Sequence, residues 1–475
     1  MLFNTLNFAF FFPLIFILYW FITNKNLKAQ NIMLLGASYF FYACWDWRFL
    51  FLLMFSTFLD YFTGLKMVQD ANRKKFWFWL SVVINLGFLG VFKYYNFFVA
   101  SFSDMVEGFG FQPNPPLLEV ILPVGISFYT FHGLSYVIDI YKGKIDAEKN
   151  IVDYSLFVSF FPLLVAGPIE RATHLLPQIK KARVFNYNSA VDGLRQILWG
   201  LFKKVVIADQ CAVIVNTIFN NQAESSGSTL VLGAILFAFQ IYGDFSGYSD
   251  IALGTARLLG IELLQNFSFP YFSRDIAEFW RRWHISLSSW FRDYLYIPLG
   301  GSKGGMWMKI RNTFIIFLVS GFWHGANWTF IVWGLLNALF IMPSIVYKTN
   351  RNNIDIVAQG KLLPNFRELI AMLVTFILTV MAWIFFRAES VTSAVSYIKG
   401  IFTRSLMSLP QNMPNRLLLL ILIFIIIEWL GREGKYGIER IFKLNWIIQV
   451  IFYYLLICSV LYFNGKEQQF IYFQF

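Results

Sequence analysis

The sequence predicts an all-α, polytopic membrane protein, and three observations carry this prediction. Hydrophobic residues make up 57% of the 475 residues, only 14% are charged, and the mean hydropathy is +0.57. Soluble domains are about 25% charged. Aromatic residues reach 20%, which suits lipid contact and interfacial belts. Long apolar runs recur along the chain, so we exclude a soluble globular protein and expect about 11 or 12 transmembrane helices.

The apolar runs define the expected spans. They cover residues 2–22, 31–47, 49–65, 76–100, 120–141, 151–168, 194–220, 229–260, 312–347, 368–386, 416–430 and 446–463. A transmembrane helix needs about 20 apolar residues, so the run 312–347 predicts a hairpin or a kinked helix. The run 2–22 has no basic segment before it and no cleavage pattern after it, which favours a retained helix over a signal peptide.

Loop charges predict the orientation. Lysine or arginine occurs in the loops 23–30, 66–75 and 142–149 and is absent from 101–119 and 221–228. Basic loops favour the cytoplasmic side, so the N-terminus is expected outside it. The run 151–168 has basic residues on both sides and is expected to be re-entrant or packed inside.

Net charge and cysteine content exclude other classes. The net charge of +12 reflects basic loops facing anionic headgroups, so nucleic-acid binding is not expected. Cys44, Cys211 and Cys458 lie in apolar runs without CxxC spacing, which predicts buried thiols and neither disulfides nor a zinc site. Without a repeat or a separable soluble segment, residues 1–475 are expected to form one integral-membrane domain.

A histidine lies in the longest uncharged stretch of the chain. His324 lies 13 residues after Arg311, roughly 20 Å at helical rise, and no charged residue occurs from 312 to 347. Gly321 and Gly325 allow the helix to break or pack closely there. An ionisable group at such depth is costly, which favours a functional role. A neutral histidine bonded to a neighbouring helix is the alternative.

The polar stretch 262–311 contains a second candidate. Residues 273–294 predict one amphipathic helix with Ser273 as its N-cap, in the headgroup plane or dipping into the protein. His284 projects from the boundary between its two faces. Boundary histidines are common on such helices, so catalytic and structural roles both stay open.

Two carboxylates lie inside the run 229–260. Asp244 and Asp250 stand among glycines that permit an unwound backbone. Buried acids at membrane depth need partners. Arg257 is one candidate partner and an arginine of another segment is the other. We expect structural ion pairs rather than chemistry for both aspartates.

Motifs of several enzyme classes are absent. The sequence has no G-x-S-x-G elbow, no H-E-x-x-H and no P-loop. Hydrolases, zinc proteases and ATP-driven pumps are therefore disfavoured, and neither a metal nor a tightly bound cofactor is expected.

Two long segments of the chain read FWRRWHISLSSWFRDYLYIPLGG (279–301) and GFWHGANWTFIVWG (321–334). They resemble the signature blocks of the membrane-bound O-acyltransferase family, in its bacterial branch that O-acetylates alginate and related exported polysaccharides. Further blocks resemble the same branch, namely PVGISFYTFHGLSYVIDIYKG (123–143), FPLLVAGPIER (161–171), FQIYGDFSGYSDIALGTARLLG (239–260) and FIYFQF (470–475). The resemblance covers essentially the whole chain and implies about eleven crossings in a ring of helices around a thin centre.

The resemblance implies a role for each histidine. The family's invariant histidine corresponds to His324, and its second, often polar or histidine, position corresponds to His284. His324 would take the proton of an acceptor hydroxyl, so that the oxygen attacks a thioester carbonyl. His284 would position the donor or stabilise the oxyanion, with Asn327 and Trp328 as further candidate hydrogen-bond donors. A covalent acetyl-His324 intermediate and direct transfer both stay open.

The implied donor is a cytoplasmic acyl thioester, either acetyl-CoA or an acyl carrier, whose phosphates would meet cations of the polar stretch. These cations are Arg281, Arg282, Arg292 and Lys303. The implied partners are a periplasmic serine-type acetyltransferase and an exported polysaccharide as final acceptor. The implied location is the bacterial plasma (inner) membrane.

Two other histidines and two other functions complete the expectations. His132, in an apolar run, is expected to be structural, with a channel-lining role as the alternative, and His174 is expected to face solvent from a polar loop. A transporter or flippase for lipid-linked sugars would also suit buried aspartate and histidine, although related halves or paired broken helices are not evident. A scaffold of a secretion complex, in which the histidines only hold helices together, is the remaining alternative.

Overall fold

The regular structure is helical throughout the described part of the chain. The computed structural model describes residues 1–111, 115, 117–118, 121–165, 167–402, 404–411, 413–465, 468 and 470–471, and every regular element in these ranges is a helix. The all-α prediction is therefore confirmed. The last four residues of the block FIYFQF, and Glu119 of the loop 101–119, lie outside the described residues. The single-domain organisation stays a prediction.

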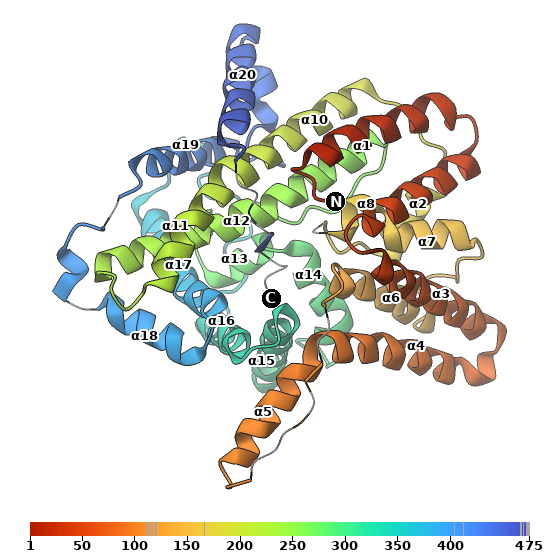
Figure 1. Cartoon of the computed structure of the whole chain (residues 1–475), viewed down its shortest axis with the longest axis horizontal. Coiled ribbons are helices and arrows are strands. Elements are labelled where there is room, and N and C mark those ends of the chain that lie inside the picture. Colours follow the sequence, from red (N-terminus) through yellow and green to blue (C-terminus); the bar gives the residue numbers. More distant parts are fainter. Residues whose placement is uncertain are drawn as a thin grey trace. The chain divides into compact units, whose positions relative to one another are not determined.

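The chain forms two compact units. The N-terminal unit comprises Met1–Asn186 with Ala256–Leu263, and the C-terminal unit comprises Tyr187–Thr255 with Leu264–Phe475. The helices of the N-terminal unit are α1 (Leu6–Ile17), α2 (Leu27–Ala43), α3 (Trp47–Gln69), α4 (Lys74–Leu89), α5 (Tyr95–Glu107), α6 (Ile126–Tyr141), α7 (Ile151–Ser159), α8 (Phe161–Leu164) and α9 (Ala172–Ile179). Within it, α3 packs against α4, α6 and α7 (Figure 1).

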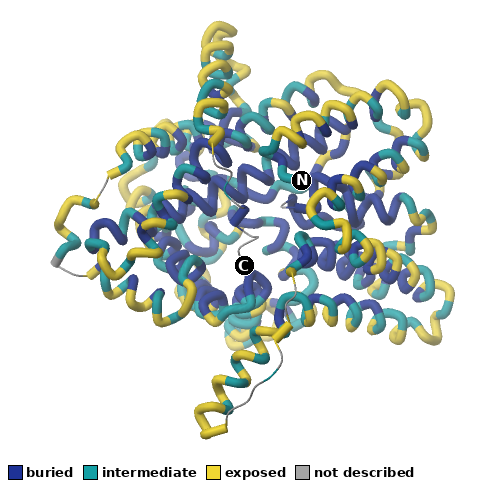
Figure 2. Tube along the Cα trace, in the orientation of Figure 1, coloured by how far each residue is buried: buried dark blue, intermediate teal, exposed yellow. Residues whose placement is uncertain are grey.

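The C-terminal unit holds both histidine candidates. Its helices are α10 (Tyr187–Leu201), α11 (Asp209–Asn220), α12 (Gly227–Leu258), α13 (Ile276–Arg282), α14 (Ile285–Phe291), α15 (Gly305–His324), α16 (Trp328–Val346), α17 (Phe366–Arg387), α18 (Val391–Ile401), α19 (Asn415–Gly431) and α20 (Trp446–Phe463). A π-helical segment, Phe202–Ala208, joins α10 to α11. Burial differs sharply between its helices, since α12 is buried along most of its length, whereas Leu456 is the one buried residue of α20 (Figure 2).

Several helices have the length and composition of membrane spans. Among the described residues, six segments qualify: Trp47–Gln69, Ala71–Glu107, Gly227–Leu258, Trp328–Val346, Phe366–Arg387 and Trp446–Phe463. The apolar segment Leu6–Ile22 is shorter. The protein is therefore a multi-pass membrane protein, as predicted. The expected 11 or 12 crossings stay a prediction.

The run 151–168 is packed inside its unit. α7 has nine residues, about 14 Å of helix, which is too short to cross a bilayer core of about 30 Å. All its residues from Asp153 to Ser159 are buried. The structure thus favours the packed alternative for this run.

The long run 312–347 folds into a hairpin of α15 and α16. Gly321 of α15 and Gly334 of α16 face each other so closely that a Cβ on Gly321 would strike the carbonyl oxygen of Phe330, and a Cβ on Gly334 would strike that of Phe317. The two backbones approach because neither position carries a side chain. The hairpin alternative of the prediction is therefore correct, and Figure 1 shows the two helices side by side.

Substituting leucine for Gly321 tests this contact. The added side chain has no room, so we expect Gly321→Leu to destabilise the protein by about 1–3 kcal/mol and to lower its thermal unfolding midpoint in detergent. Gly87→Leu is the matched control, because a Cβ there meets nothing within 4 Å. Equal midpoints for the two variants would contradict the close packing.

Candidate active site

The structure brings His284 and His324 together in the C-terminal unit. Their ring centroids are 6.3 Å apart, and their exposed fractions are 0% and 3%. They come from segments 40 residues apart in the sequence, so the tertiary fold creates the pair.

His324 is the last residue of α15, where the hairpin turns. Gly325 caps the helix in an extended conformation, and Asn327 starts α16 by accepting a hydrogen bond from the Thr329 amide at 2.9 Å. The Asn327 side-chain amide also donates to the Glu389 carbonyl at 3.0 Å. The Asn327 side chain therefore holds this turn, and its role as a hydrogen-bond donor to substrate stays a prediction.

Aromatic rings surround the His324 imidazole. The ring centroids of Trp323, Trp333 and Phe386 lie 4.9, 5.0 and 5.4 Å away, all in edge-to-face geometry. The surroundings of this imidazole are therefore largely apolar, and electrostatic interactions with a group placed inside them are strengthened.

His284 occupies a break in the helical segment and has left-handed backbone angles, φ 43° and ψ 54°. Its ring packs edge-to-face on Phe245 at 4.6 Å, and neither of its nitrogens has a hydrogen-bond partner among the described residues. Burial lowers the pKa of His284 to about 3, so the ring is neutral near pH 7. A buried polar group without a hydrogen-bond partner is costly, so this ring is a candidate for contact with a bound molecule.

The predicted single helix 273–294 is therefore wrong. Asp275 caps α13 by accepting from the Glu278 amide, whereas the Ser273 hydroxyl donates to the Pro270 carbonyl. The backbone of Trp283 is extended and that of His284 is left-handed. The helix is interrupted here because the Ile285 amide donates to the carbonyl of Asn266, in a neighbouring segment. Glu278 was expected on the polar face of this helix, but its side chain is buried, with 1% exposed.

Asn266 makes most of the contacts that hold this break. Its carbonyl accepts from the Ile285 amide at 2.9 Å, and its side-chain oxygen accepts from the Ser286 hydroxyl at 2.9 Å. Its side-chain amide donates to Ser249 Oγ on α12 at 3.2 Å. Asn266 therefore fixes the His284 turn to the buried helix α12.

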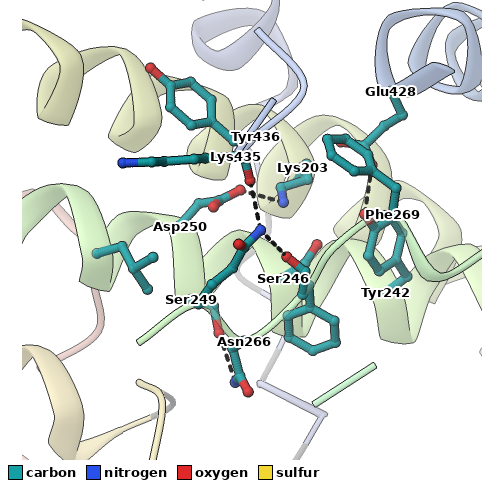
Figure 3. A pocket seen from close by; sticks show the side chains of 13 residues that line it. Lys203, Tyr242, Ser246, Ser249, Asp250, Asn266, Phe269, Glu428, Lys435 and Tyr436 are labelled. Carbon is teal, nitrogen blue, oxygen red and sulfur yellow. Dashed lines mark hydrogen bonds and ion pairs between the residues drawn. The ribbon is translucent and has the colours of Figure 1, made fainter. Parts of the chain in front are cut away.

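Both aspartates of α12 form ion pairs, as expected, but their partners are lysines of the π-helical segment. Asp244 is buried, and the Asp250 side chain is 13% exposed. Asp250 pairs with Lys203 at 2.5 Å, and Asp244 pairs with Lys204 at 2.7 Å. Figure 3 shows Lys203 and Asp250 pointing toward each other from their two helices. The expectation of an arginine partner is therefore wrong, and Arg257 forms an ion pair with Glu262.

A third buried acid lies beside these pairs. Glu428 of α19 accepts hydrogen bonds from the Tyr242 hydroxyl at 2.6 Å and from Trp199 Nε1 at 3.2 Å. Sequence reasoning missed Glu428, Asn266 and the two lysines. Lys203 and Lys204 interrupt the run 194–220, and Glu428 interrupts the run 416–430, so the criterion that selected the aspartates also applies to them.

The cations predicted to bind donor phosphates are differently placed. Arg281 donates to the carbonyls of Asn350 and Asn353 at 2.8 and 2.7 Å. Arg282 pairs with Glu278 at 2.8 Å, and both arginines are engaged by the protein itself. Arg292 and Lys303 are exposed, and Arg292 pairs with the adjacent Asp293.

The remaining histidines belong to the N-terminal unit. His132 is buried, and its Nε2 accepts a hydrogen bond from the Glu170 amide at 3.1 Å; its structural role stays a prediction. His174 lies on α9 rather than in a loop and is half-buried, a correction to the solvent-facing expectation. Its Nδ1 lies 2.8 Å from Glu170, whose carboxylate raises the pKa of His174.

These features define a class. The chain is a multi-pass helical membrane protein with a dry site built on two buried histidines, and no cluster of three or more potential metal ligands occurs among the described residues. Residues 144–385 match the family model of the membrane-bound O-acyltransferases, MBOAT. The chain belongs to this family and is an O-acyltransferase.

Curated relatives are similar over most of the chain. The probable alginate O-acetylases AlgI of Pseudomonas aeruginosa and Azotobacter vinelandii are each 38% identical, over 85% and 86% of this chain and 75% and 81% of their own. The peptidoglycan O-acetyltransferase of Helicobacter pylori is 37% identical over 84% of this chain and 79% of its own.

Removing one member of an ion pair tests whether Lys203 and Asp250 stabilise the protein together. Lys203→Met removes the cation from the partly buried Asp250 carboxylate, which keeps its hydrogen bond from Gln196, so we expect a loss of about 1–3 kcal/mol in the free energy of unfolding. The double variant Lys203→Met with Asp250→Leu removes both charges and is expected to recover most of that stability. Denaturation in detergent measures both. Additive losses in the double variant would show that the two side chains are not energetically coupled.

Proposed function

We propose that the protein transfers an acetyl or another short acyl group from a cytoplasmic thioester to a hydroxyl on the other side of the membrane, for O-acetylation of an exported polysaccharide. The meeting of His284 and His324 in one buried aromatic shell is the observation that supports this function. No described residue accepts from or donates to the His284 nitrogens, so holding helices together does not explain this ring. The relatives are named for alginate and peptidoglycan, and both are polymers outside the cytoplasm.

The reaction follows from the two rings. A nitrogen of His324 takes the proton of the acceptor hydroxyl, and the oxygen attacks the thioester carbonyl carbon. A neutral His284 donates a hydrogen bond from its N–H to the oxyanion that forms. The C–S bond then breaks, and the leaving sulfur takes the proton from His324. Direct transfer needs no covalent intermediate, which makes it the simpler of the two routes.

The acceptor and the topology complete the proposal. The immediate acceptor is the serine hydroxyl of a periplasmic acetyltransferase, which passes the acetyl group to the polymer. The protein resides in the bacterial plasma (inner) membrane with its N-terminus outside the cytoplasm, as the alternation of basic and non-basic loops supports.

Alanine substitution separates the proposed enzyme from a transporter or a scaffold. We expect His324→Ala to lower O-acetyl on the exported polysaccharide by about 10²–10⁴-fold, the usual contribution of general base catalysis, with polymer export unchanged. His284→Ala is expected to cost about 10²–10³-fold. His174→Ala is the control, since this histidine lies in the N-terminal unit. Loss of export with normal acetylation of the remaining polymer would instead identify a flippase.

The proposed function also requires that substrates reach residue 324. In a protein without Cys44, Cys211 and Cys458, His324→Cys is expected to react with a small membrane-permeant thiol reagent and to be protected by the acyl donor. Ala338→Cys, at a fully buried position of α16, is the control and is expected to stay unreactive. A residue 324 thiol that reacts no faster than this control would refute the enzymatic role.

A further inference from the structure

An apolar cavity opens between α17 and α19 in the C-terminal unit. Its volume is ≈ 640 Å³, and residues of α12 and of the segment 269–272 form its floor. Almost every side chain of the lining is hydrocarbon. The α17 wall, for example, consists of Leu369, Met372, Leu373 and Phe376. An occupant of this cavity is therefore apolar, because a polar group placed there would lose its hydrogen bonds to water.

The polar side chains of the lining are engaged within the protein. Tyr242 donates to Glu428 at 2.6 Å, and Tyr271 donates to a carbonyl of α12 at 2.6 Å. Trp429 Nε1 donates to the Leu362 carbonyl at 2.7 Å. A hydrocarbon chain that covers these groups therefore costs them no hydrogen bond.

The rim of the cavity is held by Arg432, which follows α19. Its side chain is buried and stacks on the Trp429 ring at 4.0 Å. It also donates to the carbonyls of Ala358 and Lys361 at 2.7 and 2.6 Å. Ala358 has a left-handed backbone, φ 46°, which an alanine adopts only when its surroundings enforce it. These contacts fix the segment that leads directly into the lining residues 362–364.

Two cations stand at this rim without a carboxylate partner. Lys361 belongs to the fixed segment, and Arg367 is the second residue of α17. Both are exposed, and neither takes part in an ion pair within the described ranges. Glu368 and Glu433, the acids of this rim, each pair with another arginine, at 3.6 and 2.8 Å. The rim therefore favours an anion beside the mouth of the apolar cavity.

The α17 wall also supports the histidine site. The ring centroids of Phe376 and Tyr271, a floor residue, are 5.2 Å apart, and those of Tyr271 and Trp283 are 6.1 Å apart. Trp283, the neighbour of His284, in turn lies 5.0 Å from Trp383 of α17, again between ring centroids. An occupant that fills the space between α17 and α19 therefore holds α17 against the rings beside His284.

We propose that this cavity is a lipid-binding site that takes one acyl chain of an anionic phospholipid. The chain fills the space between α17 and α19, and the phosphate lies beside Lys361 and Arg367. Lipid is the occupant that the environment supplies, because hydrocarbon chains surround the apolar surface of a multi-pass protein. The chain gains little hydrophobic free energy when it leaves the bilayer for the cavity, so specificity comes from the charge at the rim. The bound lipid stabilises the position of α17 and is not consumed by the reaction.

Retention of phosphatidylglycerol tests the headgroup contact. The protein is reconstituted in nanodiscs of equimolar phosphatidylglycerol and phosphatidylcholine, and native mass spectrometry identifies the lipid that stays bound after extraction into detergent. We expect phosphatidylglycerol to be retained in preference to phosphatidylcholine. Each cation near an anionic headgroup strengthens binding about fivefold, so Lys361→Gln with Arg367→Gln is expected to weaken this retention about 25-fold.

A matched double variant controls for net charge. Lys399→Gln with Arg416→Gln removes two exposed cations that do not line the cavity, and it is expected to retain phosphatidylglycerol as the unaltered protein does. The site is overturned if the two double variants retain the same amount of this lipid. It is also overturned if the unaltered protein retains both lipids equally.

A bulky side chain on the wall tests the position of the acyl chain. Leu373→Trp fills part of the cavity and is expected to lower the retention of phosphatidylglycerol about tenfold. Leu422→Trp is the control, because this leucine of α19 has the same exposed fraction, 53%, and does not line the cavity. Equal retention in the two variants would place the lipid elsewhere on the protein surface and overturn the assignment.

Thermal unfolding tests the stabilising role of the lipid without reference to catalysis. The unfolding midpoint of the unaltered protein is expected to be roughly 2–4 °C higher in the mixed nanodiscs than in phosphatidylcholine alone, because a ligand that binds only the folded state stabilises it. Lys361→Gln with Arg367→Gln is expected to lose this difference, and Lys399→Gln with Arg416→Gln to keep it. A difference of the same size in both double variants would show a general effect of the anionic bilayer and refute the site.

Discussion

The architecture of the site depends on backbone hydrogen bonding at two helix interruptions. His284 and His324 each occupy a point where a helix stops, and each interruption leaves amide groups that need partners in a dry interior. An asparagine serves each one. Asn266 takes up the amide of Ile285 and the hydroxyl of Ser286, and Asn327 caps α16 immediately after the His324 turn. Since an amide side chain both donates and accepts, each asparagine also ties its turn to a second segment, Ser249 in one case and Glu389 in the other. The histidines can therefore lie at buried interruptions of the helical backbone without leaving its amides unsatisfied.

The buried ion pairs follow from a close backbone contact. α12 packs against the π-helical segment at glycines, where a Cβ on Gly243 would lie 2.9 Å from the Lys203 carbonyl and one on Gly247 would lie 2.8 Å from the Gly200 carbonyl. This contact places Lys203 and Lys204 opposite Asp250 and Asp244. Insertion of a π-turn rotates successive side chains relative to an α-helix, which turns two adjacent lysines inward together. The pairs are then a consequence of helix packing, and Asn266, which bonds the same helix α12, connects that packing to the His284 turn.

The features that could be predicted from the sequence are those set by local pattern. Apolar runs predicted where helices occur, and the length of the run 312–347 predicted a hairpin or a kinked helix. The prediction of a single helix over 273–294 failed because the helical periodicity is present on both sides of Trp283. The interruption arises from Asn266, which precedes the helix and gives no signal in the sequence. The prediction of the partners of Asp244 and Asp250 failed for a similar reason. Helical spacing suggested Arg257 within the same segment, whereas the lysines come from a segment 40 to 47 residues earlier that packs alongside. The family resemblance supplied the pairing of the two histidines, which no local pattern contains.

The hairpin also places basic residues and His324 at its two opposite ends. Antiparallel helices return to the side from which they start, so the beginning of α15 and the end of α16 share one end, and His324 and Asn327 share the other. Charged residues are tolerated at the first end, because it borders water, and are excluded from the second by the cost of burial.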